Sequence, residues 1–357
     1  MNVRIILDTP ALSGIGKYVR DISEALENNV EIYTLLFEGI DHRSNYLGKT
    51  YTGRLQLPFT SGWYLNSHFQ GFAFRHFYNE IISTDQADTI YHYADYSINP
   101  RTPIERSVLT IHDFFRVKDV YREKYGYGNL RYIRRNMEKY RRFENILAIS
   151  ETVKNEAIEW GTENVPTVIY PPVARYFRPL DNKLALRVKY GLPADKILIL
   201  SVSTDDPRKN LRTVIKVAKH LGEKYSLVRV GTAVEGAYNF TNLSGDQINE
   251  IYNACDLLLF PTLDEGFGYP LVEAMSVGLP VVSSDIAVVR EIAGGAAVLV
   301  QPDVKGCLNG IKELMSDRDL FVRKGLERSR LFSFDSFSAN IRKYYQRLSK
   351  DRHPLGK

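Results

Sequence analysis

The stretch Phe260–Met275, FPTLDEGFGYPLVEAM, carries the most specific signal in the chain. It continues the apolar run 256–260, which has the composition of a strand buried on both faces. Two glycines follow, and Pro270 stands where a helix accepts proline because no hydrogen-bond donor is lost there. This order predicts a buried strand, a glycine-containing loop and a helix that begins near Pro270.

The loop and the start of this helix have the features of a site for an anion. Gly266 and Gly268 allow backbone N–H groups to approach a ligand closely, and a helix N-terminus adds N–H groups and a partial positive charge. Two carboxylates, Glu265 and Glu273, flank this site, where they are expected to accept hydrogen bonds from hydroxyl groups. The pattern indicates a ligand with both phosphate and hydroxyl groups, such as a nucleotide sugar. The helix dipole alone would also explain Glu273.

Apolar runs rich in Val, Ile and Leu alternate with amphipathic stretches along most of the chain. Such alternation is typical of α/β units with parallel sheets, in which ligands bind at the carboxyl ends of the strands. The functional residues are therefore expected on the loops that follow strands. The expected strands are residues 3–7, 31–36, 89–93, 107–111, 145–149, 197–203, 226–230, 256–260, 280–283 and 297–300.

The length of 357 residues favours two domains. Prolines cluster between residues 170 and 193, where the alternation stops, and we interpret this segment as the link between the domains. The N-terminal domain is then residues 1–172 and the C-terminal domain residues 173–334, with the site expected in the cleft between them. The stretch 335–350 predicts a last helix that could pack on either domain, including back on the N-terminal one.

Composition excludes several classes of protein. The chain is 44% hydrophobic and 25% charged, as globular proteins are. No stretch approaches the ~18 apolar residues of a membrane-spanning helix, and the N-terminus resembles a strand more than an export signal. Cys255 and Cys307 are too few for a disulfide scaffold, and no cluster has the spacing of metal ligands. We expect a cytoplasmic protein without a metal site.

The full string around Glu265 and Glu273 resembles the E-x(7)-E signature of the retaining GT-B glycosyltransferases of family four. Residues 278–284, GLPVVSS, and Glu291 follow in the order typical of that family. The resemblance implies two Rossmann-like α/β domains facing across a cleft, with the donor on residues 173–334 and the acceptor on residues 1–172. It also implies transfer of a hexose-type sugar from a nucleotide-diphospho-sugar to a hydroxyl of a glycan or lipid-linked saccharide.

A basic pair grips the donor diphosphate in the resembling family. Here Arg208 and Lys209 follow the expected strand 197–203, and a basic pair at a helix start opposes the helix dipole unless it faces an anion. Many members carry another arginine five residues before the lysine, where this chain has Thr204. We therefore expect either that Arg208 supplies the missing charge or that diphosphate binding is weaker than is usual in the family.

The resemblance also implies roles for residues of both domains. In the N-terminal domain, Gly14 and Gly16 are expected in a loop that closes over the diphosphate. His112 follows the strand 107–111, and it is expected to donate to the transferred sugar or the phosphate. In the C-terminal domain, Glu273 would hold the ribose hydroxyls and Glu265 would orient the sugar. The remaining donor-binding positions are Phe267 and Gly268, which act through their backbone, with Tyr269 and Leu271.

The family's mechanism is front-face attack by an acceptor hydroxyl. No cofactor and no metal ion are expected, because basic side chains and the helix dipole neutralise the diphosphate.

The segment 116–142 holds ten basic and three acidic residues, whereas the whole chain has a net charge of only +5. It fits an acceptor or anionic-membrane surface, a nucleic-acid site or a solvated helix face. We favour the first, with peripheral membrane contact, because members of the family often act on lipid-linked acceptors. Two other functions stay open: a sugar-nucleotide epimerase, and a catalytically silent module that binds sugar or nucleic acid.

Overall fold

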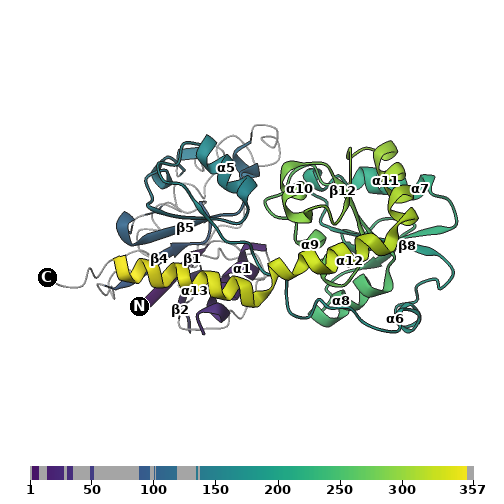
Figure 1. Cartoon of the computed structure of the whole chain (residues 1–357), viewed down its shortest axis with the longest axis horizontal. Coiled ribbons are helices and arrows are strands. Elements are labelled where there is room, and N and C mark those ends of the chain that lie inside the picture. Colours follow the sequence, from purple (N-terminus) through teal and green to yellow (C-terminus); the bar gives the residue numbers. More distant parts are fainter. Residues whose placement is uncertain are drawn as a thin grey trace, which may run out of the picture. The chain divides into compact units, whose positions relative to one another are not determined.

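The computed structural model describes residues 2–7, 14–27, 30–34, 49–51, 88–96, 100, 102–118, 134–135 and 137–351. The chain divides into two compact units, and the first contains both ends of the chain, Met1–Pro171 with Asp335–Lys357. The second unit is Pro172–Phe334 (Figure 1). Both units contain parallel sheets and helices, which confirms the α/β fold class. The change from the first to the second unit falls at the start of the proline-rich segment 170–193.

The first unit is built on a seven-stranded parallel sheet with strand order β3-β2-β1-β4-β5-β6-β7. The central strands β4 and β5 are buried at every residue, as their apolar sequences predict. The strands are β1 (Asn2–Leu7), β2 (Val30–Thr34), β3 (Lys49–Tyr51), β4 (Thr89–Tyr93), β5 (Ser107–Ile111), β6 (Asn145–Ala148) and β7 (Thr167–Val168). The helices are α1 (Gly14–Ala25), α5 (Glu151–Glu159), α13 (Phe334–Asp351) and the 3-10 turns η1 (Ile104–Arg106) and η2 (Phe115–Val117).

Helix α13, the last of the chain, packs on the first unit beside α1 (Figure 1). The rings of Tyr18 on α1 and Phe337 on α13 are 5.7 Å apart. His92 on β4 lies between the hydroxyl groups of Tyr345 and Thr110, at 2.5 Å and 2.7 Å. Burial, together with nearby His112, lowers the pKa of His92 to about 3, so the ring is neutral at pH 7.

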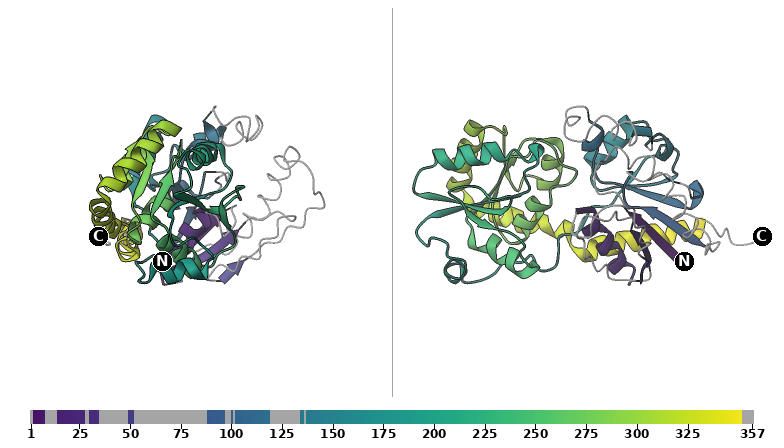
Figure 2. Two further views of the ribbon diagram at one scale, coloured as in Figure 1. Left: turned by 90° about the vertical axis from the view of Figure 1, so that its right-hand side faces the viewer. Right: turned by 180° about the vertical axis from the view of Figure 1, so that it is seen from behind.

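The second unit has a six-stranded parallel sheet with strand order β10-β9-β8-β11-β12-β13. Helices lie on both sides of this sheet (Figure 2). The strands are β8 (Ile197–Ser203), β9 (Tyr225–Gly231), β10 (Tyr238–Phe240), β11 (Leu257–Phe260), β12 (Val281–Ser284) and β13 (Val298–Val300). The helices are α6 (Lys183–Lys189), α7 (Leu211–His220), α8 (Gly245–Ala254), α9 (Tyr269–Ser276), α10 (Ala287–Ala293), α11 (Val304–Ser316) and α12 (Arg318–Ser329), with the turns η4 (Pro207–Lys209) and η5 (Arg330–Phe332).

An ion-pair cluster fixes the amino ends of the two central strands of the second unit. Asp256 precedes β11, and it accepts hydrogen bonds from Lys183 at 2.7 Å and from Arg187 at 2.6 Å. It also accepts one from the backbone N–H of Leu198 on β8, at 2.7 Å. These bonds lower the pKa of Asp256 despite its burial. This cluster lies at the amino edge of the sheet, whereas the loops that carry the expected site lie at the opposite, carboxyl edge.

The predicted helix start near Pro270 is confirmed, because α9 begins at Tyr269 and Pro270 is its second residue. Other local expectations were wrong. The segment 170–193 contains the helix α6, and the short strands β3, β7 and β10 were not expected.

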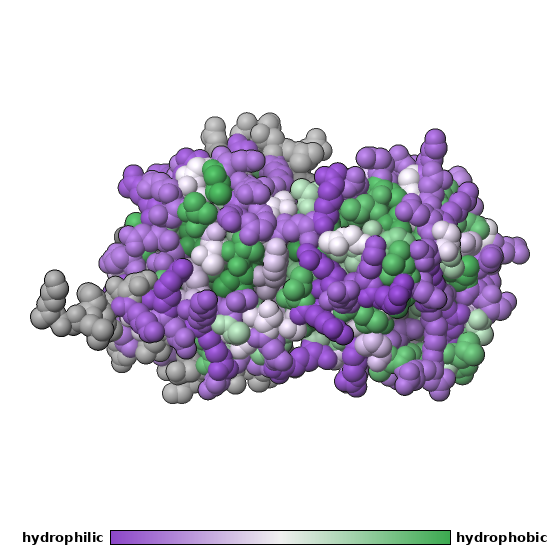
Figure 3. Space-filling view, in the orientation of Figure 1, coloured by the Kyte–Doolittle hydropathy of each residue, from purple (hydrophilic) through white to green (hydrophobic). Residues whose placement is uncertain are grey.

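On the face drawn in Figure 3, polar side chains predominate and apolar ones form small separate areas.

Candidate active site

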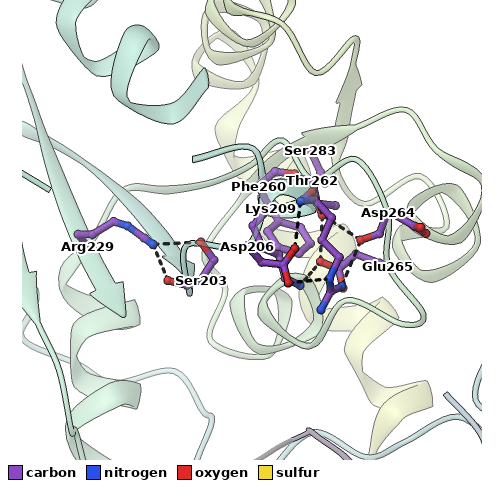
Figure 4. A network of polar contacts seen from close by, with 10 residues as sticks. Ser203, Asp206, Lys209, Arg229, Phe260, Thr262, Asp264, Glu265 and Ser283 are labelled. Atoms are coloured by element: carbon purple, nitrogen blue, oxygen red, sulfur yellow. Dashed lines mark hydrogen bonds and ion pairs between the residues drawn. The ribbon is translucent and has the colours of Figure 1, made fainter. Parts of the chain in front are cut away.

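Two loops of the second unit meet at the carboxyl edge of its sheet. One follows β8 and continues through η4, and the other follows β11 and leads into α9. The strands β8 and β11 are parallel neighbours, with Ile199 opposite Leu257. Because the carboxyl ends of parallel neighbours lie at the same edge, this pairing brings Lys209 next to Glu265, which is far from it in the sequence (Figure 4). Arg208 reaches the same carboxylate.

The carboxylate of Glu265 is the centre of this site. Lys209 Nζ donates to its Oε1, and Arg208 Nη1 donates to its Oε2 at 3.3 Å. The hydroxyl of Thr262 lies 3.0 Å from Glu265 Oε1 and also 3.0 Å from the carbonyl oxygen of Arg208, so its single proton can serve either acceptor. Glu265 is only 9% exposed. Two cations thus share one carboxylate in a largely buried contact, and Asp206 is a second acid beside Arg208.

Local backbone structure aims the two basic side chains. They lie on the turn η4, not at the start of the helix α7 as expected. Asp206 caps this turn by accepting a hydrogen bond from the Arg208 N–H at 3.1 Å, and it lies 3.6 Å from Arg208 Nε. Asn210 then adopts a left-handed conformation at φ +54° before α7 begins. The 2.6 Å hydrogen bond from the Leu263 N–H to the Arg208 carbonyl ties η4 to the loop after β11.

The N-terminus of α9 lies next to Glu265 in the sequence and has no side-chain cap. Its N-cap is Gly268 at φ +91°, a conformation that other residues adopt only with strain. The positive end of the helix dipole therefore lies at the same edge as Arg208 and Lys209. The side chains of Phe267 and Leu271 are buried, so these two residues can meet a ligand only through their backbone.

The second carboxylate, Glu273, is held by a residue that the sequence analysis missed. Tyr252 on α8 donates its hydroxyl hydrogen to Glu273 Oε2 at 2.8 Å. The tyrosine is fully buried, and burial together with the adjacent carboxylate raises its pKa well above the usual value. It therefore stays a hydrogen-bond donor at neutral pH, and it fixes one oxygen of Glu273.

In the first unit, two of the expected residues lie in a helix. Gly14 is the first residue of α1 and Gly16 lies in its first turn, not in a loop as expected; residues 8–13 lie outside the described part of the chain. His112 directly follows β5, as expected, and is 6% exposed. Its ring packs edge-on against Tyr18 of α1 at 5.0 Å. The end of β5 and the beginning of α1 therefore form one small cluster in this unit.

Most of the basic segment 116–142 lies outside the described residues, so its predicted surface stays a prediction. In the part that is described, Lys118 pairs with Glu156 and Arg141 pairs with Glu138, at 2.9 Å and 2.8 Å. Across the described ranges, no helix is long and apolar enough to cross a membrane. No group of three or more metal-ligating side chains occurs within the same ranges.

Two family models match the chain. The model described as Glycosyl transferases group 1 matches residues 182–327, and the model described as Glycosyltransferase Family 4 matches residues 12–175. The first match lies in the second unit, and the second match takes in most of the first unit.

Mannosyltransferases are among the similar proteins. The O-antigen chain mannosyltransferase B of Escherichia coli is 26% identical over 296 residues, which are 74% of this chain and 76% of that protein. The serotype-specific mannosyltransferase WbdA of Escherichia coli is 27% identical over 248 residues, which are 60% of this chain. That relative is much longer, since the match spans only 30% of its length.

Solved structures share the fold over nearly the whole chain. A sucrose-phosphate synthase from Thermosynechococcus elongatus has a TM-score of 0.79 at 18% identity, over 98% of this chain and 99% of that one. HepE of Anabaena, solved with UDP-glucose, has a TM-score of 0.75 at 16% identity, over 97% of this chain and 100% of that one. The fold expected from the sequence, two α/β domains of the GT-B type, is confirmed.

Proposed function

Because the chain belongs to the family 4 glycosyltransferases, we propose that it moves a hexose-type sugar from a nucleotide-diphospho-sugar to a hydroxyl of a glycan or lipid-linked saccharide, with retention of the anomeric configuration. The donor class is supported by the likeness to HepE, which was solved with UDP-glucose. The sugar and acceptor classes are supported by the relatives named as O-antigen mannosyltransferases.

One observation carries the proposal: Arg208 and Lys209 converge on Glu265 beside the uncapped N-terminus of α9. A diphosphate needs such a group of fixed positive charges, both to bind and to leave when the bond to the sugar breaks. Without donor, Glu265 balances part of this charge. When the donor binds, Arg208 and Lys209 bind its diphosphate in place of Glu265, and Glu265 can then accept hydrogen bonds from the sugar hydroxyls.

The other residues act on the two ends of the donor. Glu273, oriented by Tyr252, accepts hydrogen bonds from the ribose hydroxyls. The backbone of Phe267 and Gly268 contacts the sugar, and His112 of the first unit donates to the sugar or the phosphate. The acceptor hydroxyl attacks the anomeric carbon from the face that the diphosphate leaves, and a leaving phosphate oxygen takes its proton. The basic pair and the helix dipole supply the charge stabilisation without a metal ion.

The test is donor turnover on a panel of GDP-, UDP-, ADP- and dTDP-hexoses, measured as release of the nucleoside diphosphate. We expect slow release in water with one donor class and faster release when the acceptor is present. Lys209→Gln should lower this release by about 10²- to 10³-fold, as removal of one transition-state donor does in other enzymes.

Lys183→Gln is the matched control. Lys183 also pairs with a partly buried acid in the second unit, Asp256, but at the amino edge of the sheet. Its turnover should match that of the unaltered protein. No release from any donor, or equal release from the Lys209 variant and the unaltered protein, would remove the proposal.

A further inference from the structure

Arg229 is a fully buried arginine on β9. In the sheet it lies opposite Ser201 of β8, and its guanidinium extends toward the carboxyl end of that strand (Figure 4). Nη1 donates to the Ser201 carbonyl at 2.8 Å and to the Val230 carbonyl at 3.2 Å. Nη2 donates to the Ser203 carbonyl at 2.5 Å and contacts the Ser203 hydroxyl at 3.0 Å. All of these acceptors are neutral.

No carboxylate of the described residues lies within ion-pair distance of Arg229. Its Nε is buried without a hydrogen-bond partner. Burial lowers the pKa of Arg229 to about 10, against the opposing effect of Asp205, so the guanidinium is still charged at pH 7. Burying a cation without an anion is unfavourable for folding. Packing alone therefore does not explain a charged arginine at this position, and a functional role is expected.

Arg187 shows the contrast within the same unit. It is also buried, at 5% exposure, but its guanidinium donates to the carboxylate of Asp256 at 2.6 Å. That pair lies at the amino ends of β8 and β11, where it fixes the sheet. Arg229 lies toward the carboxyl end of β8, the edge that carries the basic pair Arg208 and Lys209, and it has no such anion.

The backbone around Arg229 is shaped so that the Ser203 carbonyl approaches β9 closely. Gly231, the last residue of β9, has φ +113°, and a Cβ there would lie 2.2 Å from that carbonyl oxygen. Thr232 adds two contacts, because its N–H donates to the Ser203 carbonyl at 3.3 Å and its hydroxyl accepts from the Asp205 N–H at 2.8 Å. The loop that leads to Asp206 and the turn η4 is therefore held from β9.

We infer that Arg229 is a positioning residue for the donor diphosphate. Its guanidinium donates hydrogen bonds to the carbonyl oxygens at the end of β8, whose partial negative charge would otherwise repel an anion. It also adds a positive charge to the carboxyl edge of the sheet. It also holds Ser203, the residue from which the loop to Arg208 and Lys209 starts, while Thr204 in that loop brings no charge. This inference rests on the proposed function, since it takes a nucleoside diphosphate as the ligand.

The experiment measures the affinity of the full chain for a nucleoside diphosphate and for the corresponding nucleoside, by calorimetry at two salt concentrations. The variants are Arg229→Gln and, as the matched control, Arg187→Gln. Arg229→Gln should weaken diphosphate binding by about 3- to 10-fold, from loss of one charge near the phosphates. It should leave nucleoside binding unchanged and reduce the salt dependence of diphosphate binding. Arg187→Gln should lower thermal stability and leave both affinities unchanged.

The outcomes separate this inference from the proposed function. If the unaltered protein binds no nucleoside diphosphate, the proposed function itself fails. If it binds one and Arg229→Gln binds it equally well, or loses nucleoside and diphosphate binding to the same extent, the role of Arg229 is refuted. Should the Gln variant not fold, Arg229→Met, an apolar side chain of similar length, replaces it with the same expected loss. Arg229→Lys should recover most of the diphosphate affinity.

Discussion

Replacing Glu265 with glutamine should change donor binding and turnover in opposite directions. Its carboxylate is held by Lys209 and Arg208, and the residue is only 9% exposed. It therefore opposes a diphosphate that must approach the same two cations. Glu265→Gln removes that negative charge and keeps the size of the side chain.

The size of the effect follows from the geometry. A carboxylate that contacts the same two cations as the diphosphate lies about 6 Å from it, and two unit charges at that distance repel by about 1–3 kcal/mol at effective dielectric constants of ~20–40. Some of this gain is lost because Lys209 and Arg208 are held less firmly without the carboxylate. We expect nucleoside diphosphate to bind about 3- to 10-fold more tightly to Glu265→Gln. Sugar transfer should fall by about 10²-fold or more, because the sugar loses its carboxylate partner.

Calorimetry with the nucleoside diphosphate and a turnover assay with the full donor measure the two effects separately. Glu250→Gln is the control, since Glu250 also accepts from a lysine, Lys189, but on α8 and outside the loops of the site. Weaker diphosphate binding by Glu265→Gln would refute the reasoning, because it would mean that the carboxylate mainly holds the cations in place.

Three further results are expected. Tyr252→Phe removes a hydrogen bond to the charged Glu273, worth about 1.5–3 kcal/mol, and should raise the KM for the donor by about 10-fold or more with little change in kcat; an unchanged KM would refute the positioning role. Gly268→Ala should impair donor binding, because it strains the N-cap of α9 at φ +91°. The control Gly191→Ala, at φ +63° with open space around it, should lower stability alone. Equal donor affinity in both variants would argue against a role of the N-terminus of α9 in donor binding. Because His92 is held neutral with a pKa of about 3, the unfolded chain binds more protons than the folded one between pH 3 and 6.5. The free energy of unfolding should therefore fall as pH drops through this window, by up to about 1.4 kcal/mol per pH unit. Urea unfolding at pH 5 and 7.5 should show a smaller difference between the two pH values for His92→Asn than for the unaltered protein.

The long, apolar strands were predictable from the sequence. Residues 107–111 and 197–203 form β5 and β8 with the expected bounds, because buried parallel strands are written as continuous apolar runs. The strands β3, β7 and β10 were missed because two or three residues carry no periodic pattern.

The site was predictable only where its residues form a local motif. Glu265 and Glu273 stand in one readable string, but the contact of Glu265 with Lys209 depends on the pairing of β8 with β11, which no local pattern contains. The roles of Tyr252 and Arg229 could not be predicted from the sequence, because each lies in an ordinary helix or strand pattern with no functional motif around it. Their importance depends on which polar group they meet in the interior, and that depends on the packing of the whole unit.

The most direct test of the central claim is a crystal structure of the protein with the nucleoside diphosphate of its donor. We expect oxygens of the diphosphate within about 3 Å of Lys209 Nζ and of the Arg208 guanidinium, with the phosphates at the N-terminus of α9. The Lys209–Glu265 contact should then be broken or lengthened. A nucleotide bound elsewhere, with both basic side chains still on Glu265, would contradict the account.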